Sequence, residues 1–311
     1  MNEQNPVDND GLRSNAFGTK YEEIPVSMLT DIITDQHVQF MNAEEATLEE
    51  LADVIDLIKA KDLKKLAFGC KNGPGIMKPG VNTLAKARLE QKEVVYTEFV
   101  LEKLCFVIGL KVRRNLKELF LQNLPITLWV PSLRMNRAIY LRKLSLRYCR
   151  LSDYGCKSLF GNISPSITHI DLTGNGITSK GTLFICDAIK VQNAYTLFDT
   201  NLKAIQYLCL NNNPIGNEGL GYLVDALFSD FSVKSIEVRN CNIDELKESL
   251  ILAVVNTSLE VFDIRSNPIK NKKQVNKLIK LIQKNNPPRA ATFKWSSGVQ
   301  LFEDEDEKEP K

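Results

Sequence analysis

The side chains best suited to catalysis are scarce in this sequence. Its 311 residues include two histidines, His37 and His169, and seven cysteines that form no Cys-x-x-Cys pair. His169 precedes Asp171 by two positions, a spacing that would place both on one face of a strand as an acid–base pair. No nucleophile accompanies them at a matching spacing, and two histidines leave little material for a metal site. The sequence therefore predicts no enzyme, no metal and no cofactor.

Composition narrows the class of protein further. A formal net charge of +2, with 43% hydrophobic and 25% charged residues, is the balance of a globular protein and not of a polybasic nucleic-acid arm. No apolar run approaches the roughly 18–20 residues needed to cross a bilayer, and residues 1–14 lack the apolar core of a signal peptide. We expect reduced thiols, a cytoplasmic location, and neither membrane nor nucleic acid as a partner.

One recurring pattern predicts the elements that position these residues. The series L-x-x-L-x-L-x-x-N/C-x-I/L has a weaker copy at Leu116 and clear copies at Leu141, Ile167, Ile205, Val233 and Leu259. The start-to-start spacings are 25, 26, 38, 28 and 26 residues, and all but one fall in the usual range of about 20–29 for leucine-rich repeats. We assign the excess of the long unit to an insertion at 191–203, after a helix ending near Ile189.

Each unit joins a strand-like half to a helix-like half. Gly155, Gly181 and Gly219 follow the first residue of their units by fourteen positions, and apolar residues then recur four positions apart. That spacing puts them on one face of a helix. A strand, a turn and a helix in each unit indicate an α/β leucine-rich-repeat solenoid of the ribonuclease-inhibitor-like type. It is a horseshoe with a parallel concave sheet and convex helices.

The repeats also set the expected domain boundaries. We expect a mostly disordered N-terminal segment at 1–30 and a leucine-rich-repeat domain at 31–290. Within the domain, a cap spans 31–62, an irregular unit 63–115 and regular units 116–290. A C-terminal cap is expected at 291–302, and an acidic disordered tail at 303–311.

The ninth position of each unit is predicted to be structural. It ends the strand, where backbone groups lose their partners in the sheet, and an inward amide supplies both a donor and an acceptor. Cysteine replaces asparagine in two units, and we interpret both thiols as small buried groups and not as metal or redox sites. This structural ladder comprises Cys149, Asn175, Asn213, Cys241 and Asn267.

The odd strand positions between the core leucines project onto the concave face in this template. Acids recur at the fifth position and arginines at the seventh, so the surface is of mixed charge and not a basic groove for phosphates. Arginines and aromatic residues are typical of protein-binding hot spots. We predict a protein-binding surface formed by Phe120, Arg147, His169, Asp171, Tyr207, Asn211, Glu237, Arg239, Asp263 and Arg265. Alternatively, these charges only neutralise each other across adjacent strands, each pair contributing about 0.2–1 kcal/mol.

A second candidate surface is the last helix. Lysines recur there at helical spacing, opposite an apolar stripe, at Lys273, Lys277, Lys280 and Lys284. They form either a solvated helix face or a docking site for an acidic partner, and the acidic tail at 303–309 is a candidate to screen them.

The order of irregularities resembles a known family. The segment LRKLSLRYCRLSDYGCKSLF, and LEVFDIRSNPIKNKKQVNKLIKLIQKNN closed by FKW, are similar to the seventy-eight-kilodalton centrosomal protein family over about residues 35–298. The oversized unit before Ile205 and the broken first unit with its loop at 70–80 share the resemblance. It implies a non-enzymatic cytoskeletal scaffold at the centrosome, centriole or ciliary basal body, active in cilium assembly. Its implied partners are centriolar proteins or ubiquitin-ligase subunits.

Two other functions fit the repeats themselves. One is a substrate-recruiting ubiquitin-ligase subunit, although the only helical run before Leu63, at 47–60, fits a repeat cap better than an F-box. The other is an adaptor or regulator of another cytosolic enzyme, such as a GTPase or a ribonuclease.

Overall fold

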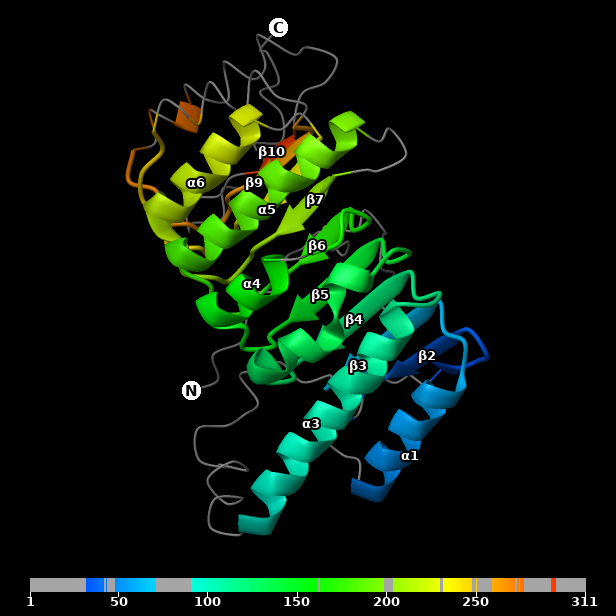
Figure 1. Cartoon of the computed structure of the whole chain (residues 1–311). Coiled ribbons are helices and arrows are strands. Elements are labelled where there is room, and N and C mark those ends of the chain that lie inside the picture. The colour runs from blue at the N-terminus through cyan, green and yellow to red at the C-terminus, as the bar shows by residue number, and fades with distance from the viewer. Residues whose placement is uncertain are drawn as a thin grey trace, which may run out of the picture.

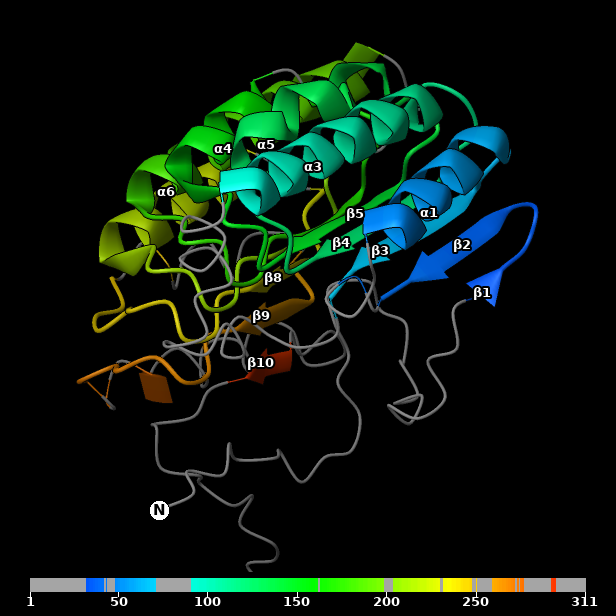
Figure 2. The ribbon, with the colours of Figure 1, turned by 90° about the horizontal axis from the view of Figure 1, so that it is seen from below.

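The computed structural model shows a curved solenoid with a single sheet on one side and helices on the other (Figure 2). It describes residues 32–41, 43, 48–70, 91–161, 163–198, 204–229, 232–247, 250, 259–271, 273, 275, 276 and 292–294. The α/β leucine-rich-repeat horseshoe predicted from the repeat pattern is confirmed.

The sheet contains ten strands arranged in chain order (Figure 1). β1 and β2 pair antiparallel, and every later pair is parallel, as expected when each strand returns through a convex segment. The strands are β1 (Ile32–Ile33), β2 (His37–Phe40), β3 (Lys65–Gly69), β4 (Glu118–Gln122), β5 (Lys143–Arg147), β6 (His169–Asp171), β7 (Tyr207–Cys209), β8 (Ser235–Glu237), β9 (Val261–Asp263) and β10 (Thr292–Lys294).

Register between strands keeps like repeat positions side by side. Leu144 of β5 pairs with Leu119 of β4 and with Ile170 of β6, and all three side chains are fully buried. Burying a side chain of this size is worth about 1.5–3 kcal/mol. Because the same position is apolar and buried through Leu208, Ile236 and Phe262, the core is continuous along the solenoid.

Helices cover the opposite side of the sheet (Figure 1). They are α1 (Leu48–Ala60), α3 (Gln91–Val112), α4 (Ser152–Phe160), α5 (Ser179–Phe198) and α6 (Gly216–Ser229). In the unit beginning at Leu116, two 3-10 helices, η3 (Thr127–Leu133) and η4 (Met135–Arg137), replace the α-helix. The expectation of an α-helix in every regular unit is wrong here. Pro131 lies inside η3, and proline lacks the N–H that an α-helix would use.

The oversized unit differs from the sequence-based expectation. α5 continues from Ser179 to Phe198, well past the predicted helix end near Ile189, so much of the proposed insertion is helical. Val191 and Tyr195 in this extension are 54% and 53% exposed. The buried side chain of the extension at Gln192 is polar and donates a hydrogen bond to the Ser164 carbonyl, so the extension shows no apolar period. Residues 199–203 lie outside the described part of the chain.

The segments expected to form the caps contribute to the two ends of the sheet. The helical run at 47–60 corresponds to α1, and the irregular unit contributes β3, which pairs with β2 and β4. At the other end, residues 292–294, within the segment proposed as the C-terminal cap, form β10 beside β9. The predicted disordered segments at 1–30 and 303–311, and Lys277, Lys280 and Lys284, lie outside the described residues. The repeat-domain boundaries at 31 and 290 stay proposals.

Candidate functional site on the concave sheet

Three columns of side chains, at the third, fifth and seventh repeat positions, lie on the concave strands, and the seventh includes Gln122, Arg147, Arg239 and Arg265. The third repeat position is in register from β4 to β9 through Glu118, Lys143, His169, Tyr207, Ser235 and Val261. The fifth position is aligned in the same way through Phe120, Ser145, Asp171, Cys209, Glu237 and Asp263. Parallel pairing thus collects side chains from six repeats onto one surface.

The acids of the fifth column are buried and not presented to solvent. Asp171, Glu237 and Asp263 are 1%, 6% and 3% exposed, although the repeat template places their side chains on the concave face. Long side chains of the seventh column cover them instead. The expectation that these carboxylates form part of an open protein-binding surface needs correction, because arginine side chains lie between them and solvent.

Arginines hold the buried acids through short contacts. Arg265 donates hydrogen bonds from Nε and Nη2 to Asp263 at 3.1 and 3.0 Å. Arg239 forms ion pairs with Asp263, from Nε at 3.6 Å, and with Glu237, from Nη2 at 3.4 Å. Arg147 is held more loosely, with its Nε 3.7 Å from Asp171. The charges therefore neutralise each other, as the alternative interpretation of the pattern proposed. Two of the four pairs join adjacent repeats, Arg239 with Asp263 and Arg147 with Asp171, and the other two lie within one repeat.

Asn211 is also buried, and its side chain holds neighbouring residues of the next repeat. It is 6% exposed, its Nδ2 donates to Glu237 Oε2 at 2.9 Å, and its Oδ1 accepts from the Arg239 backbone N–H at 2.7 Å. Burial raises the pKa of Glu237, while Arg239 and the Asn211 hydrogen bond oppose that increase. This group of residues secures strands β7 to β9 and leaves the arginines as its exposed part.

His169 and Asp171 do not form the acid–base pair that their spacing suggested. Asp171 accepts hydrogen bonds from the Thr173 hydroxyl and backbone N–H. His169 stacks on Tyr207 of the next strand, with ring centroids 4.2 Å apart and planes 18° from parallel. Burial lowers the pKa of His169 to about 4, so the imidazole is neutral at physiological pH. The two rings form an uncharged, half-buried platform on the concave face.

The strands before this platform present a more open surface. Phe120 is half-buried, and Ala67 of β3 is its neighbour in register. Glu118 lies between two lysines, 3.4 Å from Lys65 and 3.8 Å from Lys143. Lys65 and Ala67 were not among the predicted contact residues. They could have been predicted from the weak repeat start LKKLAF, because aligning it with the other repeats places both residues in the concave columns.

The ninth position forms a hydrogen-bonded ladder. The Asn213 amide donates from Nδ2 to the carbonyls of Leu172 and Leu210, and its Oδ1 accepts from two backbone N–H groups of the preceding unit. Asn175 and Asn267 repeat the arrangement, with Asn175 accepting from the N–H of Cys149 and Asn267 from that of Cys241. The thiols of Cys149 and Cys241 donate to Leu121 and Leu210 carbonyls at 3.5 and 3.2 Å.

The eighth position is a regularity that sequence reasoning missed. Its backbone is left-handed in six successive units, at Asn123, Tyr148, Gly174, Asn212, Asn240 and Ser266. The ring of Tyr148 packs so closely over Gly174 that an added Cβ would lie 2.0 Å from it. Beyond that glycine, Asn212 Nδ2 donates to the Tyr148 hydroxyl at 3.2 Å. The frequency of asparagine at this position was the available signal, since asparagine tolerates left-handed backbone.

Cysteine chemistry has no support from the environment of the thiols. Burial raises the pKa of Cys149, Cys156, Cys186 and Cys241 to about 12, which keeps them protonated and poorly nucleophilic at neutral pH. Among the described residues, no group of three or more histidine, cysteine or acidic side chains is arranged to hold a metal ion. Within the same part of the chain, no helix has the length and apolarity to cross a membrane.

Comparison with known proteins agrees with this architecture. The leucine-rich-repeat family model matches residues 138–160 and 164–186, which contain β5, α4, β6 and the beginning of α5. The chain is a leucine-rich-repeat protein.

Its relatives define the kind of repeat region. It is 28% identical over 214 residues to "Protein Cep78 homolog" of Drosophila melanogaster, covering 60% of this chain and 26% of that protein. It is 25% identical over 187 residues to human "Centrosomal protein of 78 kDa", covering 54% of this chain and 27% of the relative. The repeats are similar to a leucine-rich-repeat region of these centrosomal proteins. The matched region spans about a quarter of the length of these relatives.

A more distant similarity shows how widely the repeat is used. Human "NACHT, LRR and PYD domains-containing protein 7" is 25% identical over 150 residues, which cover 48% of this chain and 14% of that protein.

Proposed function

We propose that this protein is a non-enzymatic scaffold that holds a protein partner on its concave sheet at the centrosome or ciliary basal body. Support for the location comes from the names of its relatives, which are centrosomal proteins. Support for the role comes from the repeat architecture, which exposes a long curved surface and buries its reactive groups. Centriolar proteins and ubiquitin-ligase subunits are the proposed partner classes.

One observation carries the proposed contact surface. The stacked rings of His169 and Tyr207 lie in register with Lys143 and Glu118, and both rings remain partly exposed on the concave face. Phe120 follows in the neighbouring column. Aromatic rings supply large contact areas with little loss of side-chain freedom, and they are enriched at protein-binding hot spots. We therefore place the centre of the partner contact on strands β4 to β7.

The test combines imaging with a matched control. The tagged full chain is expressed in a ciliated cell and located against a centriole marker, together with the double variant His169→Ala and Tyr207→Ala. Tyr195→Ala serves as the control, because Tyr195 is an exposed tyrosine on α5, on the opposite side of the solenoid. We expect centriolar signal for the parent and the control and its loss in the double variant. Diffuse signal for the parent, or unchanged signal in the double variant, contradicts the proposal.

Arg239 and Arg265 are poorer choices for this experiment. Replacing both would leave the buried Asp263 without either of the cations that pair with it, and leaving a buried acid unpaired is strongly destabilising. Loss of centriolar signal would then not distinguish a lost contact from a lost fold.

A further inference from the structure

The replaced helix of the unit beginning at Leu116 leaves a recess on the convex side of the solenoid. A 3-10 helix is thinner than an α-helix, and η3 and η4 occupy the place of an α-helix beside α4. Arg134 separates the two 3-10 helices with a left-handed backbone (φ 52°), so the segment turns sharply there. Between this segment and α4 lies a recess of about 520 Å³.

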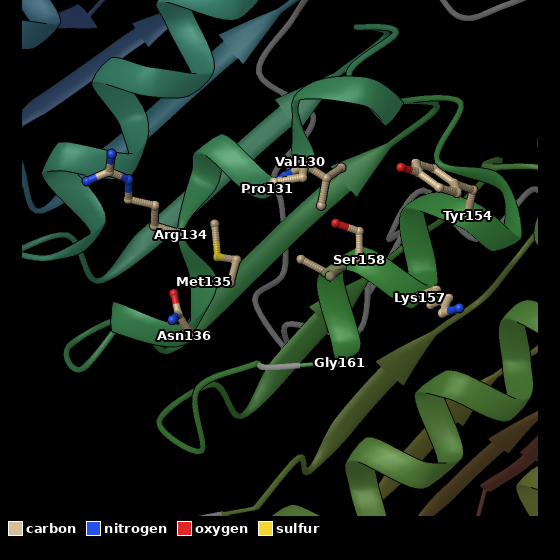
Figure 3. A pocket seen from close by; sticks show the side chains of 10 residues that line it. Val130, Pro131, Arg134, Met135, Asn136, Tyr154, Lys157, Ser158 and Gly161 are labelled. Carbon is tan, nitrogen blue, oxygen red and sulfur yellow. The ribbon is translucent and has the colours of Figure 1, made fainter.

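The recess combines an apolar floor with hydroxyl groups. Val130 and Met135 contribute from η3 and η4, and Leu159 contributes from α4, with each residue at most 4% exposed. Tyr154 and Ser158 of α4 face Val130 and Met135 across the opening (Figure 3). Tyr154 is 63% exposed, so its ring is available to an incoming side chain. Methionine adapts its shape readily, which suits a site for an incoming apolar side chain.

The rim of the recess is positively charged. Arg134 and Lys157 are among its lining residues, and none of the lining residues is acidic. Aromatic rings, and not carboxylates, hold both cations: Arg134 lies 5.5 Å from the centre of the Phe106 ring, and Lys157 lies 6.0 Å from that of Phe184. Such contacts fix the position of a cation without neutralising its charge.

The nearest carboxylate on α4 is already used elsewhere. Asp153 accepts hydrogen bonds from the backbone N–H groups of Thr178 and Gly181 and from the Thr178 hydroxyl. It ties α4 to the start of the next unit. Among the described residues, no acidic side chain lines the recess, so the charge at its mouth is available to another molecule.

We infer that this recess binds an acidic segment of a partner protein, with one apolar side chain inserted between Val130 and Met135 and carboxylates paired with Arg134 and Lys157. Charge complementarity selects this occupant: two cations flank an apolar floor, and a charged group inside the floor would lose its hydration without a partner. The site is separate from the concave contact proposed above, because it lies on the helical side of the sheet.

The experiment uses the full chain and a fluorescein-labelled synthetic peptide in which Leu-Phe is flanked on each side by acidic residues. Binding is followed by fluorescence anisotropy. We expect saturable binding that weakens at least tenfold when Arg134→Glu and Lys157→Glu are combined. Ser158→Trp, which fills the recess without changing its charge, should weaken binding by a similar factor. A peptide with Ser-Ser in place of Leu-Phe should bind at least fivefold more weakly.

The matched control is Arg113→Glu combined with Lys180→Glu, two exposed cations outside the recess that give the same change in net charge. Affinity should change less than twofold in this control, and thermal unfolding should show that every variant is folded. Equal loss in the control pair would overturn the proposal, as would failure of the peptide to bind. Peptide affinity that rises when residues 303–311 are deleted would assign the site to the chain's own acidic segment and overturn the partner assignment.

Discussion

The two halves of the concave sheet use the same repeat position in opposite ways. At the fifth position, β3 and β4 carry Ala67 and Phe120, which are half-buried, whereas β8 and β9 carry Glu237 and Asp263, which are buried. The neighbouring seventh position explains the difference. Gln122 leaves the first half open, while Arg239 and Arg265 cover the acids of the second half. One column of a leucine-rich repeat can thus form a contact surface or support the sheet, depending on the column beside it.

The largest expected effect concerns the ladder that both halves depend on. Asn213→Leu removes two hydrogen bonds that the Asn213 amide donates to buried carbonyls and two that it accepts from buried backbone N–H groups. We therefore expect the free energy of unfolding to fall by about 3 kcal/mol. Urea unfolding at neutral pH measures it. Asn136→Leu, at an exposed asparagine of η4, should change stability by no more than about 0.5 kcal/mol. Similar unfolding midpoints for the two variants would show that the ladder is unimportant.

A pair of substitutions compares the two halves directly. Asp263→Ala should cost about 1–2 kcal/mol, because it breaks contacts with Arg239 and Arg265 in a buried setting. Glu118→Gln breaks the equivalent contacts with Lys65 and Lys143 near the surface and should cost no more than about 0.5 kcal/mol. Chemical denaturation of both variants is the measurement, and equal losses would contradict the distinction between a supporting and an open half.

The pH dependence of stability tests the burial of Glu237. Burial raises the pKa of its carboxyl, so the native state holds this proton more tightly than the unfolded state does. The stability that this residue contributes is complete below its ordinary pKa of 4.5 and decreases as the pH rises through the raised value. Relative to Glu237→Gln, the parent should therefore lose stability between pH 4.5 and pH 7. Parallel unfolding curves across that range would indicate a solvated carboxyl.

The smallest expected effect is the titration of His169, at the boundary between the halves. Burial, with a smaller contribution from the charge of Lys143, lowers the pKa of its imidazole to about 4. Proton NMR should give a titration midpoint near 4 for the His169 ring, with the signal assigned from His169→Ala. The stability contributed by the neutral ring is present above pH 6.5 and is lost as the pH falls toward 4. A midpoint near 6.5 would mean that the stacked platform with Tyr207 is open to water.

Much of the fold was predictable because the core positions repeat. Leu144, Ile170 and Leu208 occupy the same place in successive units, so each unit confirmed the assignment of the next. Where that repetition fails, prediction failed as well. The 3-10 helix η3 contains Pro131, which is confined to one unit, and α5 continues to Phe198 through residues that show no apolar period.

The candidate concave site was predictable only by column. Repeat position placed His169 beside Tyr207 and Asp171 near Arg147, and both pairs are in contact. Position alone did not reveal which of these side chains reach solvent, because exposure depends on the length and direction of neighbours one strand away. Nor did the convex recess leave a motif, since Val130, Met135 and Tyr154 belong to two different units.

The sequence by itself determined the repeat, the parallel sheet and the register, because the spacing of apolar residues is a local property that recurs in every unit. Only the tertiary structure decided which concave acids are buried beneath Arg239 and Arg265, and where a thin convex segment leaves a recess beside α4. Those features arise between units, where side chains distant in the chain compete for the same space.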